Sequence, residues 1–275
     1  MKAETDSFVK LPKTRTEQFF DLIKNRFFTL SGLSILIAVF VLPLVFWFYL
    51  AFYQKSLRLQ IEPSREQIDI LLVCFKWNIM IFVIANPFLV FFSLGLSGAF
   101  QVIQLLIWRE NINLMSDFFK GIKTKGKFFG LLALIFTIIL FLWQFNFDFY
   151  LLFKKELKLI TLFGMVGSAL LLYFSMIIIL FMFAQFIHYE VKFKNCFKNA
   201  IIFSITLFPK NILFSFIIFC PFLLTFFISL FGQLIYLLFL AGIGFSLMIL
   251  IWLLYATSVF DVYINKVKRG LVQPN

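Results

Sequence analysis

Long apolar runs are the feature of this sequence that most restricts its fold. The stretch at 28–52 contains no charged residue, and similar runs recur along the 275-residue chain. A helix needs about 20 consecutive apolar residues to cross the hydrocarbon core of a bilayer. Composition points the same way, since 62% of the residues are hydrophobic, only 14% are charged and the mean hydropathy is +0.99. A water-soluble domain is therefore excluded.

The apolar runs are continuous, whereas the strands of a transmembrane barrel would alternate apolar and polar residues. Residues 131–136, for example, read Leu-Leu-Ala-Leu-Ile-Phe. We therefore predict an all-α polytopic bundle with six spans. The spans are expected at residues 28–52, 70–108, 128–151, 159–187, 212–230 and 234–260.

Three of these spans carry features that predict local geometry. The second is too long for one straight crossing at about 1.5 Å per residue, so we expect it to be kinked or broken near Pro87. Gly164 and Gly167 give the fourth span a smooth face that another helix can approach. Only Phe231-Gly232-Gln233 separates the fifth and sixth spans, which predicts a tight hairpin there.

The distribution of Lys and Arg over the loops predicts the orientation. The N-terminal segment, the second and fourth loops and the C-terminal tail hold 18 of them, against six in the alternate loops. Short cytoplasmic loops carry the excess of basic residues, so we expect both termini on the cytoplasmic side of a bacterial plasma membrane. The chain then divides into a cytoplasmic N-terminal segment with an elbow at 1–27, a six-span domain at 28–260 and a basic cytoplasmic tail at 261–275.

The net charge of +12 follows from the same loops. Basic residues beside span ends meet an anionic leaflet, so we expect anionic lipids of the bilayer as partners at the cytoplasmic face. Nucleic acid is not expected as a partner, because its recognition needs a basic surface on a soluble domain. Phe accounts for 44 residues, and its AT-rich codons, with those of Ile, Lys and Asn, indicate a low-GC bacterium.

Three cytoplasmic segments resemble one another, and each precedes a span. Residues 19–24 and 118–123 match at an offset of 99 residues, and 196–201 is a weaker third copy. We expect each to form a short amphipathic helix, here called an elbow, on the cytoplasmic leaflet. Three elbow-plus-hairpin units at 17–108, 117–188 and 192–260 would then account for the chain. Chance similarity in a chain rich in Phe, Ile and Lys is the alternative to a common origin of the repeats.

The third elbow has the clearest amphipathic pattern. Its apolar stripe follows the spacing i, i+3, i+4, i+7, i+8 and i+11, and the Lys and Asn side chains lie largely off it. The stripe consists of Phe193, Cys196, Phe197, Ala200, Ile201 and Ser204. Pro209 marks the turn into the fifth span, because the residue before a proline disfavours helix. The candidate interface residues of the second and third elbows are Phe119, Lys120, Lys123, Phe197, Lys198, Asn199 and Pro209.

The sequence contains no H-E-x-x-H, G-x-S-x-G or phosphate-loop motif, so we expect no catalytic residue. The cysteines are scattered, and the single histidine, His188, reads as an interfacial residue at a span end, so no metal or cofactor site is expected. Asn86 is the main polar residue at mid-span depth. It either bonds carbonyls freed by the proline beside it or lines a polar pathway, for which Asn78, Asn86 and Pro87 are the candidate residues.

Four segments resemble the YesL-like family of bacterial integral membrane proteins. They lie at 117–123, 183–186, 196–201 and 207–210 and share the family's F-F-K-x-x-K, K-N-A and L-x-P runs. Asn78 and Pro87 also match its N-x8-P pattern, in which eight residues separate an Asn from a Pro. The resemblance covers about residues 76–232 and implies an accessory role in carbohydrate uptake, with ABC permease subunits as partners.

These features favour a non-catalytic integral membrane protein that is accessory to carbohydrate uptake. A small-solute permease with a pathway near Asn86 is the first alternative. A membrane scaffold with a lipid-binding role is the second.

Overall fold

A computed structural model describes residues 14–61, 67–224 and 230–265, and within these ranges the regular elements are all helices. The predicted all-α class is confirmed for this part of the chain. The elements are α1 (Arg15–Ile61), α2 (Gln67–Ile107), α3 (Leu114–Phe153), α4 (Lys158–His188), α5 (Phe193–Thr206), α6 (Phe208–Leu224), α7 (Leu230–Phe239), the π-helix η1 (Leu240–Gly244) and α8 (Phe245–Tyr263).

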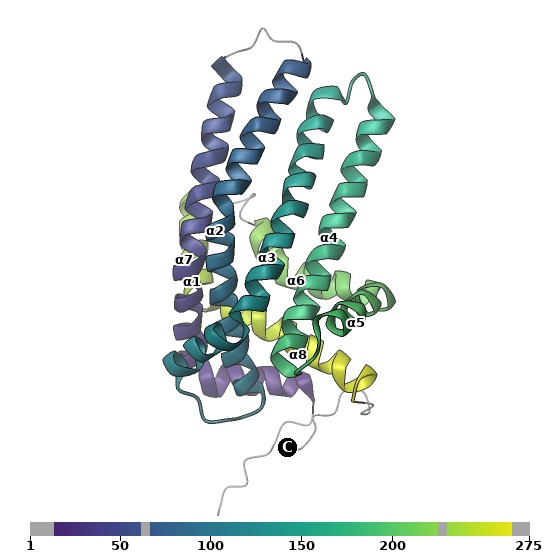
Figure 1. Ribbon diagram of the computed structural model, residues 1–275. Coiled ribbons are helices and arrows are strands. Elements are labelled where there is room, and N and C mark those ends of the chain that lie inside the picture. The colour runs from purple at the N-terminus through teal and green to yellow at the C-terminus, as the bar shows by residue number, and fades with distance from the viewer. Residues whose placement is uncertain (1–13, 62–66, 225–229, 266–275) are drawn as a thin grey trace, which may run out of the picture.

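The four longest helices, α1 to α4, form the body of the molecule and run alternately up and down (Figure 1). Each packs against the next in chain order. The elements from α5 to α8 pack against the lower half of this body, where α8 contacts α1, α2 and α4. Helix α1 ends and α2 begins at the upper end in Figure 1, whereas α1 begins and α8 ends at the lower end.

Several helices are long and apolar enough to cross a membrane, which indicates a multi-pass membrane protein. Among the described residues there are five such stretches, or six if the bent pair of α5 and α6 counts as one span. The five are Arg15–Arg58, Gln67–Ile107, Leu114–Phe153, Lys158–His188 and Ile235–Tyr263.

Close glycine packing joins α2 to α3. A Cβ atom added at Gly121 would lie 2.6 Å from Gln101 Cβ and 2.9 Å from the Ser97 carbonyl, and one at Gly98 would lie 2.7 Å from the Phe118 ring. Only residues without a Cβ allow the two backbones to approach this closely. Of the two glycines expected to face another helix in the fourth span, a Cβ at Gly164 would lie 3.3 Å from Asn146 Oδ1 of α3, whereas one at Gly167 would have no neighbour within 4 Å among the described residues.

Helix α2 runs without a break through Pro87, so of the kink or break predicted at this position the break is wrong. Pro87 lacks an N–H and removes one helical hydrogen bond, but the helix is held on both sides of it. Ala85 and Leu89 are buried against Leu44 of α1. Trp47 of α1 also donates a hydrogen bond of 3.0 Å to the Ile81 carbonyl. Packing on α1 thus maintains the helix where the proline weakens it.

The predicted tight hairpin at Phe231-Gly232-Gln233 is also wrong, because all three residues lie inside α7. A single glycine costs a helix only about 1 kcal/mol, which an apolar segment such as Leu230–Phe239 absorbs through packing. Helix α7 continues through η1 into α8, and Ile235–Tyr263 forms one apolar stretch. The connection before α7, residues 225–229, lies outside the described residues.

Two of the three predicted elbows are set off from the following helix by a break. In α1 the backbone leaves helical geometry at Arg26, with φ −127° and ψ 23°. Helices α5 and α6 meet at an angle of 93° around Leu207, two residues before Pro209. The second elbow differs, since residues 118–123 continue unbroken into the span within α3.

Polar contacts fix the first elbow at the lower end. Arg15 Nη2 lies 2.5 Å from Asp261 Oδ2 of α8 and Gln18 Nε2 donates to the Ile107 carbonyl at 2.7 Å. Arg109 pairs with Asp21 at 2.9 Å. The start of α1 and the end of α8 therefore meet at the same end of the bundle.

Candidate functional site

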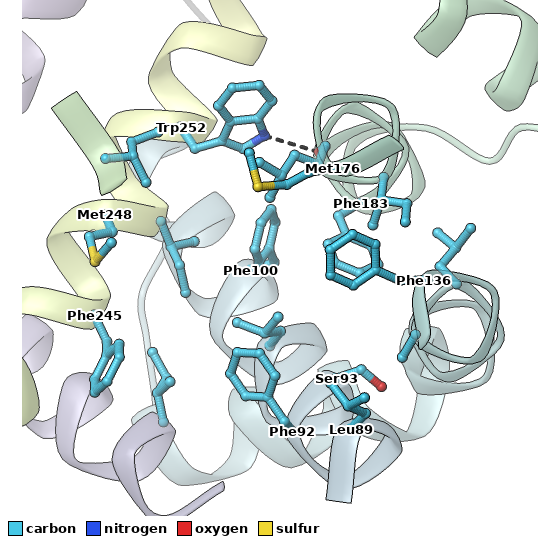
Figure 2. Close-up of a pocket in the computed structure, with 18 of the residues that line it drawn as sticks. Leu89, Phe92, Ser93, Phe100, Phe136, Met176, Phe183, Phe245, Met248 and Trp252 are labelled. Carbon is cyan, nitrogen blue, oxygen red and sulfur yellow. Dashed lines mark hydrogen bonds between the residues drawn. The ribbon is translucent and has the colours of Figure 1, made fainter. Parts of the chain in front are cut away.

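A cavity of about 340 Å³ lies where α6 and α8 pack against α2, α3 and α4 (Figure 2). We call it the apolar chamber. Its size falls at the lower end of the range of about 300–1,000 Å³ that is typical of ligand pockets. Aromatic, Met and aliphatic side chains form its walls, among them Phe92, Phe100, Phe136, Met176, Phe183 and Met248.

The polar groups in the chamber lining are already hydrogen-bonded. Ser93 Oγ donates to the Val90 carbonyl of its own helix at 2.7 Å. Trp252 Nε1 donates to the Leu180 carbonyl at 3.0 Å, the dashed line in Figure 2. The other lining side chains carry no N–H or O–H group. The chamber can therefore bind a ligand through its shape and through dispersion contacts, because its lining side chains have no free hydrogen-bond donor.

A cluster of aromatic rings supports one wall of the chamber, where Phe100 and Phe183 line the cavity and Phe129 packs against both. The rings of Phe129 and Phe183 are parallel within 3° with centroids 3.9 Å apart, and Phe100 meets both in edge contacts. Each of the three side chains is almost fully buried. They come from three helices, α2, α3 and α4, so this wall is a fixed part of the core.

The bend between α5 and α6 brings Ile218 and Phe219 into the chamber lining. Asn211 stabilises this bend from a fully buried position. Its Nδ2 donates to the carbonyls of Phe203 and Ser204 at 3.0 and 3.1 Å, which satisfies the carbonyl end of α5. Tyr255 of α8 in turn donates to Asn211 Oδ1 at 2.6 Å. The turn expected from the sequence before the fifth span is thus present, but it lies at Leu207, and Pro209 to Asn211 form the first turn of α6.

A separate site, made of polar side chains and here called the polar cluster, lies toward the upper end between α1, α2 and α3. Lys55 Nζ contacts Asp148 Oδ2 at 2.6 Å and donates to Asn78 Oδ1 at 2.9 Å. Asn78 Nδ2 donates to the same carboxylate oxygen at 2.7 Å, and Gln144 Nε2 donates to the other at 3.1 Å. All four side chains are buried. In this cluster the Lys55 ammonium is paired with the Asp148 carboxylate, and both oxygens of that carboxylate accept hydrogen bonds.

Sequence reasoning identified Asn78 but missed its partners. Lys55 lies in the predicted loop that follows the span at 28–52, and Asp148 lies near the end of the predicted span at 128–151. Helix α1 extends to Ile61, which carries Lys55 into the bundle. The available signal was a single acidic residue inside the apolar run at 128–151, since a charge at this depth needs a partner.

The other two residues of the candidate pathway behave differently. Asn86 is half-buried, and its Oδ1 is buried without a hydrogen-bond partner. Pro87 is exposed at the surface of the helix. The structure does not bring Asn86 into the polar cluster, which leaves Asn78 and Asn86 in separate environments.

The elbow candidates are mostly exposed, as an interfacial role requires. Phe119, Lys120 and Lys123 are exposed beside the buried Phe118. In the third elbow Phe197 and Lys198 are exposed, and so is Pro209. Asn199 is half-buried and donates to Gln185 Oε1 at 3.4 Å.

The buried face of α5 is rotated from the predicted stripe. Cys196, Ala200 and Ser204 are buried as expected, but Phe203 joins them while Phe193 and Phe197 face outward. Packing against neighbouring helices sets this orientation of α5, because Phe203 contacts the rings of Phe181 and Phe260. The outward phenylalanines leave α5 with apolar side chains on an exposed face.

No metal-binding arrangement occurs among the described residues, where no three His, Cys, Asp or Glu side chains are suitably grouped. Cys74 and Cys196 are free and buried, and the side chain of Cys220 lies outside the described part. His188 donates through Nδ1 to the Ala184 carbonyl at 2.9 Å, and its Nε2 lies 3.1 Å from Thr257 Oγ1. These contacts give the histidine a place between α4 and α8.

No protein-family model matches the chain, and no curated protein or solved structure matches it either. The candidate sites therefore rest on the geometry of this chain.

Proposed function

We propose that the protein is a non-catalytic membrane scaffold that holds a lipid hydrocarbon chain in the apolar chamber. The observation that carries this proposal is a cavity of about 340 Å³ whose polar lining groups, Ser93 and Trp252, are already hydrogen-bonded to backbone carbonyls. A hydrocarbon chain needs no hydrogen-bond partner, so the chamber matches its chemistry.

The same lining disfavours a polar ligand. A sugar hydroxyl or an ion that entered the chamber would lose hydration without gaining a partner, at a cost of roughly 2–7 kcal/mol per polar group. The chamber therefore supports the binding of a lipid chain better than the passage of a small polar solute.

Exchange with the surrounding bilayer follows from the physics of the site. Lipid tails are as apolar as leucine, so moving one from the bilayer into the chamber gains little hydrophobic free energy. Binding then depends on shape and dispersion contacts with rings such as Phe100 and Phe183. A chain held in this way exchanges readily, which suits a scaffold rather than a carrier that must retain its ligand.

The elbows supply a second contact with lipid at the lower end. Phe119 and Phe197 are about half exposed beside the exposed Lys120, Lys123 and Lys198. Apolar side chains next to basic ones suit the interface of an anionic leaflet. The charge distribution over the loops supports assigning this end, with both termini, to the cytoplasmic side.

Association with ABC permease subunits is the partner that the resemblance to YesL-like proteins supports. Pull-down of the full chain from native membranes of sugar-grown cells tests it. Recovery of permease subunits would support the accessory role, and their absence would count against it.

Photolabelling tests the lipid site directly. The full chain is reconstituted in nanodiscs with a diazirine-bearing fatty acid, irradiated and mapped by mass spectrometry. We expect labels on chamber residues such as Met176 and Met248 in addition to the outer surface. Ala133→Phe, which places a ring in the chamber lining, should abolish the chamber labels, since Ala133 is buried there.

The matched control is Ile138→Phe on the same helix. Ile138 is 63% exposed, so its replacement adds the same ring on the lipid-facing surface. Chamber labels should persist in this variant. Labels confined to outward-facing residues of the unmodified protein would contradict the proposed function.

A further inference from the structure

The Asn86 oxygen is a buried acceptor for which the described chain supplies no partner. Buried polar atoms in proteins are nearly always hydrogen-bonded, so such an atom calls for an explanation. An unmade bond is especially unfavourable at the centre of an apolar span, where water is scarce.

Asn86 is not itself one of the residues that line the apolar chamber, but it precedes two of them on α2. Leu89 and Ser93 belong to the lining and follow Asn86 by three and seven residues, which places the three on one helical face. The rise from Asn86 to Leu89 is about 4.5 Å. The oxygen therefore lies about one helical turn above the chamber wall.

Neighbouring elements leave this oxygen unpaired for identifiable reasons. The antiparallel register that pairs Phe82 with Phe141 brings Thr137 of α3 to the level of Asn86. The single proton of Thr137 Oγ1 is already donated to the Ala133 carbonyl at 2.9 Å. Toward the upper end, the edge contact of Phe82 with Phe141 separates Asn86 from the polar cluster. A donor for Asn86 must therefore come from the chamber side or from lipid.

We propose that Asn86 Oδ1 accepts a hydrogen bond from the hydroxyl or amide N–H of a single-chain amphiphile whose hydrocarbon tail occupies the apolar chamber. This rests on the proposed lipid-binding function and specifies its ligand class. The head group is neutral, because the Lys55–Asp148 charges are already paired with each other on the far side of the phenylalanine contact. It is a donor, because the unsatisfied atom is an acceptor.

A matched pair of probes tests the proposal on the full chain in nanodiscs. Hexadecanol and hexadecyl methyl ether share a chain, but only the alcohol donates a hydrogen bond. Each competes with the diazirine-bearing fatty acid for labelling of Leu89 and Met176. We expect the alcohol to compete at a concentration about fivefold to tenfold lower than the ether, as one net hydrogen bond provides.

The variant Asn86→Leu should remove this difference, so that both probes compete equally and the chamber is still labelled. Asn86→Gln keeps an amide oxygen and serves as the conservative comparison, which should retain part of the preference. The contrast between probes in the unmodified protein needs no variant, so a folding defect in Asn86→Leu leaves the test intact.

Two other outcomes overturn separate claims. Equal competition by alcohol and ether in the unmodified protein would overturn the role of Asn86 while leaving the chamber as a lipid site. Competition by neither probe, with no chamber label, would overturn the proposed function itself.

Discussion

The polar cluster and the apolar chamber share helices α2 and α3, yet they accommodate polar groups in opposite ways. In the cluster, Lys55 and Asp148 form an ion pair that Asn78 and Gln144 complete with hydrogen bonds. About 16 Å further along α2 the chamber begins, and its polar lining groups bond only to backbone carbonyls. One region is therefore saturated with side-chain partners, and the other is lined by hydrocarbon.

This difference separates a structural element from a binding site. A buried charge in a membrane protein is tolerated only when it is paired, so the cluster constrains the relative positions of α1, α2 and α3. The lining of the chamber contains no ion pair, and its open volume allows a hydrocarbon chain to enter and exit. Asn86 lies between the two regions and is satisfied by neither.

The largest expected effect is the loss of the ion pair. Asp148→Leu leaves the buried Lys55 ammonium without its counter-charge, so we expect a loss of roughly 3–5 kcal/mol in the free energy of unfolding. The double variant Lys55→Met with Asp148→Leu should recover most of this loss, because no buried charge remains. Equilibrium unfolding in mixed detergent micelles measures both.

Lys154→Met is the control for charge removal at the same end, since Lys154 is exposed. It should change stability by no more than about 0.5 kcal/mol. If the single and double variants of the ion pair lose the same stability, the cluster does not act as a paired unit.

The close approach of α2 and α3, the two helices that both regions share, gives a smaller expected effect. Gly121→Leu would place a Cβ 2.9 Å from the Ser97 carbonyl and force the helices apart. Overpacking of this kind costs about 1–3 kcal/mol. Gly167→Leu introduces the same side chain where the described residues leave 4 Å of free space, and should be near neutral. Equal melting temperatures for the two variants would show that the close approach is not needed.

The smallest effect compares one hydrogen bond in each region. Gln144→Leu removes the donor to Asp148 Oδ1 and should cost about 1 kcal/mol, because a buried carboxylate oxygen loses its partner. Ser93→Ala removes a hydroxyl that bonds only within its own helix, so its cost should stay below about 0.5 kcal/mol. The chamber labels should be unchanged in Ser93→Ala. A larger loss for Ser93→Ala than for Gln144→Leu would reverse the contrast between the two regions.

Sequence periodicity and composition predicted the helical class and several helices long and apolar enough to cross a membrane, because a bilayer requires long apolar helices. The turn between α5 and α6, just before Pro209, was also predictable because it depends on local backbone preference. The buried position of Cys196 was predictable because it follows from helical spacing. The predictions that failed, at Pro87 and at Phe231-Gly232-Gln233, relied on a single residue to interrupt an apolar helix. Packing against neighbours outweighed those local preferences.

The candidate sites were less accessible from sequence. Asn86 was identified as a polar residue at mid-span depth, and Asn78 as a member of the same span, but neither residue's partners follow from its position. The chamber has no sequence signature, because its walls consist of the same Phe, Met and Leu residues that cover lipid-facing surfaces elsewhere in the chain.

The sequence by itself determined that this chain forms apolar helices that are long enough to cross a membrane, since this follows from the length and continuity of its apolar runs. Only the tertiary structure decided that Lys55 pairs with Asp148, that Asn86 Oδ1 has no partner among the described residues and that α6 and α8 meet α2, α3 and α4 around a cavity. Each of these depends on contacts between residues distant in sequence, where the register of neighbouring helices decides which side chains meet.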